Sequence, residues 1–191
     1  MKCEKDAFNL GISIVAQELN CVPELTIEEN LFLGREPIKN KCFIDKKERS
    51  RRTKELLEMM GLDYDSSAKV STLSVAQRQM IEILKAISRN SKVIIMDEPT
   101  SALTNAETVI FFHKVKELKA QGISFVFISH RLEEVFELCD EYTVLRDGKW
   151  IQSGQLKDIN TEQLIALMVG RDIQDIYPSI FPHQNETLLE V

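Results

Sequence analysis

The chain has 191 residues, 43% of them hydrophobic, which is enough apolar material for a buried core in one domain or one and a half. A formal net charge of -6 and a pI near 5.2 argue against a broad basic surface for nucleic acid or for an anionic membrane. The four cysteines form no CxxC pair and no stretch approaches the roughly 20 apolar residues of a membrane span, so the composition disfavours zinc, disulfide and transmembrane classes and fits a reducing cytosol.

The first part of the chain predicts one strand and then a short helix. Its opening residues, "MKCEKDAFNLG", lack the hydrophobic core of a signal peptide. Residues 11–17, "GISIVAQ", are rich in β-branched side chains and predict a strand that ends at Gln17. Thr26 and Glu29 form a capping box, which predicts the start of a helix, and Gly34 is expected to end it.

Two longer helices are expected next. Residues 45–60 carry charges on one side, while the other side is formed by Leu56, Leu57 and Met60. Ser74 and Gln77 form a second capping box and predict the start of another helix. The apolar face of that helix consists of Met80, Ile83, Leu84 and Ile87.

After Asn90 the pattern alternates between strand and helix. Residues 93–96 and 124–129, "SFVFIS", predict two strands on either side of a helix. A capping box at Thr104 and Glu107 opens this helix, and Gly122 is expected to end it. Its inward face is formed by Phe111, Val115 and Leu118. Strands this uniformly apolar predict burial on both faces, as in a parallel sheet that helices cover.

The last part of the chain predicts a helix, a hairpin and a linker. Residues 132–138 predict the helix, and Asp147-Gly148 between alternating apolar residues predicts a tight hairpin. Residues 171–191 contain two prolines and little periodicity, which is typical of a linker. They end in "LLEV", which we expect to open a strand of a further domain.

Two adjacent carboxylates, Asp97 and Glu98, follow the predicted strand at 93–96. Since neighbouring side chains of a strand point to opposite faces, the two acids can serve different positions around one substrate. Nucleotide hydrolysis requires such a pair, because one acid holds a magnesium-bound water and the other orients or deprotonates the attacking water. On this stretch alone, an equally good interpretation is that both acids only favour the positive end of the next helix.

Three further residues lie where a γ-phosphate site would need them. His130 follows the second strand and would lie beside Glu98 if the two strands pair, where it can donate to a phosphate oxygen. Gln17 could reach the metal or the water, and Ser74 begins a helix whose free backbone N–H groups can bind an anion. Taken singly, each also fits an ordinary role as a capped histidine, a surface amide or a helix cap.

The order and spacing of these motifs resemble the ATP-binding cassette ATPases, the motor subunits of ABC transporters. Gln17 resembles the Q-loop glutamine, and His130 resembles the switch histidine. Residues 73–77 resemble the signature motif, 93–98 Walker B with its catalytic glutamate, and 101–104 the D-loop. The resemblance implies that ATP and Mg²⁺ bind, that Glu98, His130 and Gln17 are catalytic, and that Asp97 and Gln17 hold the metal, partly through water. It implies nucleotide contacts for Ser74, Val75, Ala76, Gln77, Ser101 and Ala102.

Within that superfamily the chain resembles the tandem ATPases of bacterial monosaccharide importers of the ribose, galactose and xylose type. This resemblance implies an α/β fold: a partial P-loop NTPase (RecA-like) parallel-sheet core with an α-helical subdomain at about residues 24–90. The N-terminal strands and the phosphate-binding loop of that core would be missing. Residues 1–170 would form a partial ABC ATPase domain, and residues 171–191 a linker and the start of a second cassette.

The resemblance also implies partners and a location. Transmembrane permease subunits would contact the helical subdomain and the stretch just after Gln17. A second ATPase cassette, in the same parent chain or in a homodimer, would complete the nucleotide sites, and a periplasmic or extracellular sugar-binding protein would act indirectly. No nucleic-acid partner is expected, and the protein would be peripheral, on the cytoplasmic side of the plasma membrane.

The sequence departs from the family pattern in two ways. It contains no phosphate-binding loop GxxxxGK[ST], because its one Gly-Lys pair, Gly148-Lys149, lies in the predicted hairpin. In the family this loop precedes the Q-loop, so we expect an N-terminal truncation and negligible ATPase activity of the isolated chain. Val75 and Ala76 stand where the usual signature has two glycines, so the two composite sites of the parent are expected to be unequal.

Three alternatives stay open on the sequence alone. The parent could import a nucleoside or another small molecule with a similar tandem ATPase. The chain could instead be a degenerate, non-catalytic module that docks on a permease or an intact cassette. Soluble relatives in DNA repair or translation are disfavoured by the acidic charge and by the lack of long insertions.

Overall fold

A computed structural model describes residues 4–40 and 42–170. The chain divides into two compact units, Met1–Leu138 and Cys139–Val191, each of which is described by itself. The predicted linker at 171–191 lies outside the described residues. Within the described ranges, no helix combines the length and the apolar character that a membrane span requires.

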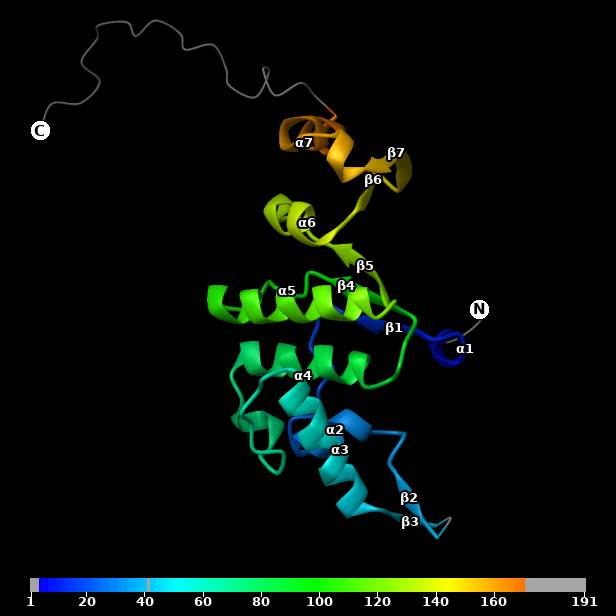
Figure 1. Cartoon of the computed structure of the whole chain (residues 1–191), viewed down its shortest axis with the longest axis vertical. Helices are drawn as coiled ribbons and strands as arrows, with labels where there is room; N and C mark the ends of the chain where they lie inside the picture. Colours follow the sequence, from blue (N-terminus) through cyan, green and yellow to red (C-terminus); the bar gives the residue numbers. More distant parts are fainter. Residues whose placement is uncertain (1–3, 41, 171–191) are drawn as a thin grey trace, which may run out of the picture. The chain divides into compact units, whose positions relative to one another are not determined.

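A three-stranded parallel sheet organises the first unit (Figure 1). Its strands, in the order β1-β4-β5, are β1 (Ile12–Val15), β4 (Val93–Asp97) and β5 (Ser124–Ile128), and the short helix α1 (Glu4–Asn9) precedes β1. Both strand pairs are parallel, as predicted, and the strand before Glu98 pairs with the strand before His130, which was the condition for placing His130 beside Glu98. The carboxyl ends of all three strands therefore meet at one edge of the sheet.

The two faces of this sheet differ in burial. One face is buried and is formed by Ser13, Val15, Ile94 and Met96. On the other, the register aligns Ile14 with Ile95 and Ile95 with Val126, so these side chains share a face. Ile14 is 54% exposed, Val126 49% and Ile128 48%. The prediction that the strands are buried on both faces is therefore wrong for the described residues, since β-branched composition alone does not reveal whether a second layer covers a strand.

Three helices form the region between β1 and β4: α2 (Ile27–Phe32), α3 (Lys46–Met59) and α4 (Val75–Ile87), with a 3₁₀ turn at Val70–Thr72. The capping boxes at Thr26 and Ser74 form as predicted, with both reciprocal hydrogen bonds present. Asp45 caps α3, as the predicted start at residue 45 requires. Helix α4 contacts β1 and α2, and α2 contacts α3, so α4 joins the helical region to the sheet (Figure 1).

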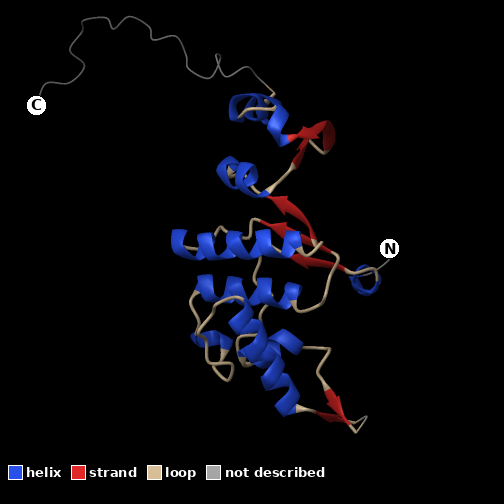
Figure 2. Cartoon of the chain, viewed as in Figure 1, coloured by secondary structure: helices blue, strands red, loops and turns tan. Residues whose placement is uncertain are grey.

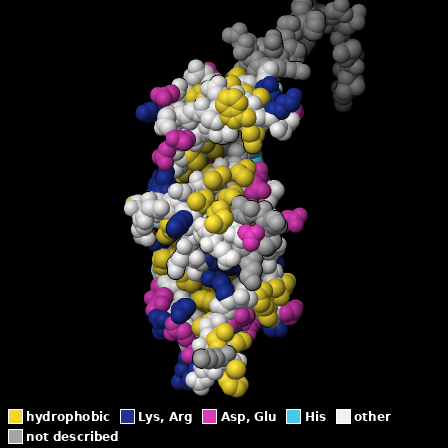
Figure 3. Space-filling model, turned by 90° about the vertical axis from the view of Figure 1, so that its right-hand side faces the viewer, with side chains coloured by type: hydrophobic (Ala, Val, Ile, Leu, Met, Phe, Trp, Pro, Cys, Tyr) yellow, Lys and Arg dark blue, Asp and Glu magenta, His cyan; other side chains and the backbone are white. Residues whose placement is uncertain are grey.

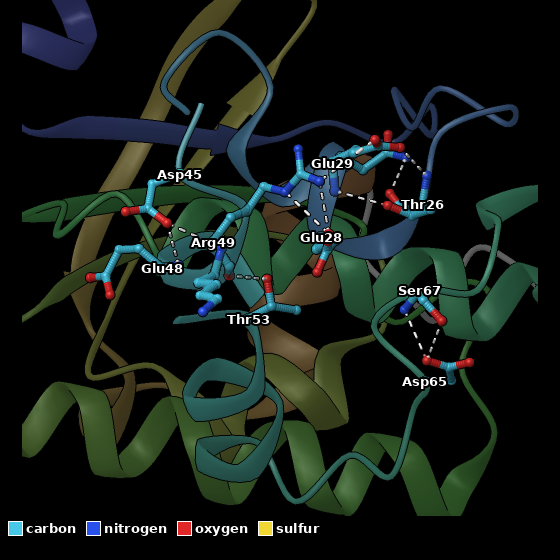
Figure 4. Close-up of polar contacts among 11 residues, drawn as sticks. Thr26, Glu28, Glu29, Asp45, Glu48, Arg49, Thr53, Asp65 and Ser67 are labelled. Atoms are coloured by element: carbon cyan, nitrogen blue, oxygen red, sulfur yellow. Dashed lines mark hydrogen bonds and ion pairs between the residues drawn. The ribbon is translucent and has the colours of Figure 1, made fainter. Parts of the chain in front are cut away.

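A buried ion pair joins α2 to α3 (Figure 4). Arg49 donates to Glu28 Oε1 from both Nη2, at 2.8 Å, and Nε, at 3.3 Å. Its Nη2 also lies 3.6 Å from Glu29 Oε1. Thr53 donates its hydroxyl to the Arg49 carbonyl, so the arginine is held at the backbone and at the guanidinium. Arg49 was not predicted to make this contact, because it lies among the charged residues of a helix whose charged side is expected to face solvent.

A small antiparallel hairpin, β2 (Ile38–Lys39) and β3 (Phe43–Ile44), connects α2 to α3. Its apolar side chains are exposed: Ile38 is 65% exposed, Phe43 71% and Ile44 51%. Hydrophobic side chains are visible at the lower end of the space-filling view, where this hairpin lies in Figure 1 (Figure 3). No such element was predicted, because two-residue strands are too short for a periodic signal.

Helix α5 (Asn105–Ala120) lies between β4 and β5 in the chain, and α6 (Leu132–Leu138) follows β5. The predicted capping box at Thr104 and Glu107 forms, and the three inward side chains of α5, Phe111, Val115 and Leu118, are buried. Gly122, just after the helix, has a φ of 91°, a conformation that favours glycine.

The second unit contains the predicted hairpin and a helix (Figure 2). Strands β6 (Glu141–Arg146) and β7 (Lys149–Gln155) pair in antiparallel fashion. The turn residues Asp147 and Gly148 have φ of 52° and 71°, as a tight hairpin turn requires. A 3₁₀ turn (Leu156–Asp158) leads to α7 (Thr161–Val169), which was not predicted although Asn160 and Gln163 form a capping box at its start.

Candidate functional site

Glu98 lies one residue beyond the carboxyl end of the central strand, since β4 ends at Asp97. Its φ is 46°, in the left-handed region that residues other than glycine rarely adopt. Its backbone N–H donates to the Ile128 carbonyl at 2.9 Å, and its carbonyl accepts from the Ser101 N–H at 3.2 Å. The left-handed turn therefore sets the direction of Glu98, whereas Asp97 is still part of β4 and follows the strand alternation expected from the sequence. Such strained conformations are found preferentially at functional sites.

The Glu98 carboxylate is held by one side chain on each of its oxygens. Gln17 Nε2 donates to Oε2 at 3.2 Å, and His130 Nδ1 lies 2.8 Å from Oε1. These side chains come from the ends of the three parallel strands, since Gln17 lies two residues after β1 and His130 two residues after β5. The structure thus brings together three residues separated by 81 and 32 positions in the chain.

This cluster is open to solvent on the histidine side. The His130 side chain is 69% exposed and the Glu98 side chain 26%. A base that is partly buried and hydrogen-bonded, next to an exposed proton donor, can orient a water molecule that enters from solvent. The arrangement suits water activation.

Asp97, the last residue of β4, is partly buried and precedes Glu98 directly. Magnesium is usually held by one or two protein oxygens together with waters and substrate phosphates. The described residues contain no group of three or more histidine, cysteine or acidic side chains that could hold a metal by themselves. Asp97 and the amide oxygen of Gln17, whose nitrogen contacts Glu98, are oxygen groups of the kind that bind Mg²⁺ together with waters and substrate phosphates.

The predicted nucleotide-contacting residues form two separate groups. Ser74 is the N-cap of α4 and accepts from the Gln77 N–H at 3.2 Å, so its hydroxyl and the first free N–H groups of α4 lie at one helix end. Val75, at the first position of the helix, is 57% exposed, and Ala76 follows it. None of these residues hydrogen-bonds to the Glu98 cluster in the described part of the chain. The predicted nucleotide contacts of these four residues would therefore be made at a site other than the Glu98 cluster.

Ser101 and Ala102 lie in the loop between β4 and α5. Ser101 is exposed and its N–H donates to the Glu98 carbonyl, so the loop that carries it is tied to the turn that positions Glu98. Two neighbours were missed by the sequence analysis: Thr100 in this loop and Glu134 in α6, which are both buried and hydrogen-bonded to each other. Their 34-residue separation leaves no local sequence signal.

The family model described as "ABC transporter" matches residues 2–101, which is more than half of the chain. The chain belongs to the ABC transporter ATP-binding family. The motif assignments from Gln17 to Walker B all fall within this matched segment, whereas His130 lies beyond it.

Known proteins extend the similarity over the whole chain. The galactose/methyl galactoside import ATP-binding protein MglA of Yersinia pestis bv. Antiqua (strain Antiqua) is 45% identical over 190 residues. The MglA protein of Escherichia coli (strain K12) is 46% identical over 187 residues. These matches cover 100% and 98% of this chain but 37% of each relative, so the chain spans little more than a third of their length.

Solved cassettes share the fold. A nucleotide-free ATP-binding cassette from an ABC transporter superposes with a TM-score of 0.69 at 28% identity, covering 91% of this chain and 71% of that one. The ADP conformation of an ATP-binding cassette gives a TM-score of 0.66 at 28% identity, covering 90% and 70%. The chain therefore has the α/β cassette fold with its parallel sheet.

Proposed function

We propose that the chain is part of the ATP-hydrolysing cassette of a bacterial importer for monosaccharides, in which ATP hydrolysis drives sugar uptake. The observation that carries the proposal is the Glu98 carboxylate beside Asp97, held between Gln17 and His130 at the ends of three parallel strands. The sugar class rests on the MglA relatives, which are galactose/methyl galactoside import ATP-binding proteins.

In this proposal four side chains act together in hydrolysis, and Gln17 has two tasks. Glu98 accepts a proton from the attacking water while the water oxygen bonds to the γ-phosphorus and the bond to the bridging oxygen of ADP breaks. His130 donates to a γ-phosphate oxygen, and its contact with Glu98 keeps base and donor at a fixed separation. Gln17 orients Glu98, and Asp97 with Gln17 would hold Mg²⁺. The metal, when bound, neutralises charge on the phosphates.

The isolated chain is proposed to be inactive. Phosphoryl transfer depends on positioning and electrostatics, and the 191 residues contain no GxxxxGK[ST] loop to hold the β and γ phosphates. The described residues would represent a RecA-like core without its first strands and phosphate-binding loop, within a partial domain at 1–170. Residues 171–191 would be a linker that leads into a second cassette.

The remaining predicted residues would act across an interface. Ser74, Val75, Ala76 and Gln77 would contact the nucleotide of a second cassette, in the same parent chain or in a homodimer. Ser101 and Ala102 would line the same junction. Permease subunits would bind the helical region, a periplasmic or extracellular sugar-binding protein would deliver the cargo, and the assembly would lie on the cytoplasmic side of the plasma membrane.

Phosphate release with MgATP tests both parts of the proposal. The chain alone should show only the background rate of the Glu98→Gln variant. Turnover by the chain alone at a rate typical of transporter ATPases, about 1 s⁻¹ or more, would contradict the proposed inactivity. A complete cassette built by adding a phosphate-binding segment should hydrolyse ATP, and Glu98→Gln in it should lower the rate by about 100-fold or more.

A non-catalytic docking module is the second candidate, and the absence of GxxxxGK[ST] from the sequence favours it. The two candidates differ in how a labelled ATP analogue binds. A docking module contributes to nucleotide binding only when an intact cassette is present, through Ser74. Unchanged inactivity of the completed cassette, together with analogue binding that requires a partner and Ser74, would select the docking module.

A further inference from the structure

Glu134, in the first turn of α6, is buried although glutamate rarely lies inside a protein without partners. The residue is 5% exposed. The hydroxyl of Thr100, itself 2% exposed, donates to Glu134 Oε2 at 2.6 Å. A buried carboxylate is costly unless it is paired and hydrogen-bonded, so this contact constrains the loop that carries Thr100. Thr100 lies two residues after Glu98.

The same carboxylate contacts the residues on both sides of His130. Ser129 Oγ lies 3.5 Å from Glu134 Oε2, and Arg131 Nη1 lies 2.6 Å from Oε1. The arginine contact is an ion pair without hydrogen-bond geometry, since Oε1 has no partner that meets that geometry. The Arg131 backbone N–H also donates to Ser129 Oγ at 3.0 Å, so the two neighbours of His130 are hydrogen-bonded to each other.

We propose that Glu134 is a positioning residue that holds the loop of Glu98 and the loop of His130 in fixed relation. One carboxylate joins Thr100 to the two neighbours of His130, while Glu98 and His130 contact each other directly. Glu98 occupies a left-handed conformation that needs support from its surroundings. The function of this positioning rests on the proposed ATP hydrolysis. The contacts themselves are observed independently of that proposal.

Amide exchange in the full chain tests the proposal without nucleotide. In Glu134→Gln and in the near-isosteric Thr100→Val, the Glu98 and Ser101 amides should exchange about tenfold faster or more. Glu134→Gln removes the negative charge that Arg131 contacts, and Thr100→Val leaves the buried carboxylate without its hydroxyl donor. Amides inside α4 should be unaffected. Thr100→Ser, which keeps the hydroxyl, should restore the slow exchange, and Glu133→Gln, an exposed neighbour on α6, is the matched control.

The ¹⁵N resonance of His130 Nδ1 provides a second measurement. In Glu134→Gln and Thr100→Val it should move toward its position in Glu98→Ala, where the histidine has lost its contact. Unchanged exchange and an unchanged Nδ1 resonance in both variants would overturn the proposal. An equal rise of exchange in α4 would also overturn it, because it would show a general structural role. A failure of ATP hydrolysis in the completed cassette would leave these measurements intact and would count against the proposed function alone.

Discussion

Replacing Arg49 by methionine should destabilise the helical region of the first unit. Methionine keeps much of the aliphatic stem but leaves the Glu28 carboxylate, whose side chain is 15% exposed, without the two donors at 2.8 and 3.3 Å. Breaking a fully buried ion pair costs about 3–5 kcal/mol. Because Glu28 keeps some contact with water, we expect a loss of about 2–4 kcal/mol in the free energy of unfolding.

Removing both partners of the ion pair distinguishes the cost of an unpaired Glu28 carboxylate from the cost of lost side-chain packing. In the double variant Arg49→Met with Glu28→Met, no uncompensated carboxylate remains, so most of the lost stability should return. Arg51→Met is the matched control on the same helix, since Arg51 is 55% exposed and pairs with Glu48 and Glu55 at the surface. Its cost should stay below about 1 kcal/mol.

Urea unfolding followed by circular dichroism at the helix band measures these differences. The single tryptophan, Trp150, lies in β7 of the second unit, so its fluorescence reports on that unit, while the circular dichroism includes the helices of the first. A loss below about 1 kcal/mol for Arg49→Met, or a double variant no more stable than the single one, would refute the assignment of Arg49 as the ionic link between α2 and α3.

Three further predictions concern titration, thiol reactivity and the helix cap of α4. The backbone N–H of Thr26 and, to a smaller extent, its hydroxyl lower the pKa of Glu29 below its ordinary value of 4.5. The ionised carboxylate therefore stabilises the fold above pH 4.5, and this contribution is lost as the pH falls through the lowered pKa. Urea midpoints should therefore fall more for the wild type than for Glu29→Gln below about pH 4.5, and equal falls would contradict this. Burial and, to a smaller extent, the negative charge of Glu82 raise the pKa of the Cys21 thiol to about 12. After iodoacetamide treatment near pH ~8, mass spectrometry should therefore find the exposed Cys42 modified long before Cys21. In a completed cassette pair, Val75→Gly and Ala76→Gly should each increase ATPase activity if side chains at these positions hold the partner's nucleotide away, and unchanged rates would remove that explanation.

Local signals in the sequence predicted much of the fold. The capping boxes at Thr26, Ser74 and Thr104 involve residues three apart, and each forms with both of its hydrogen bonds. The Asp147-Gly148 turn depends on the conformations of two adjacent residues. Such short-range chemistry is determined largely by neighbours in the chain, so it can be recognised without knowing the tertiary structure.

The candidate site was predictable only in part, because its contacts are long-range. Parallel pairing of β4 with β5 is sufficient to place His130 near Glu98. The parallel pairing of β1 with β4 likewise brings Gln17, just after β1, to the same edge of the sheet. The left-handed turn at Glu98 and the buried carboxylate of Glu134 depend on packing between segments far apart in the chain, and no local pattern marks them.

The open face of the sheet adjoins the proposed metal site. Asp97 aligns with Ile128, so it belongs to the same set of strand positions as Ile14, Ile95 and Val126. Apolar residues on that face are about half exposed, although their composition is that of strands buried on both sides. The proposed metal ligand therefore lies at the rim of the apolar face that lacks a covering layer in the described residues.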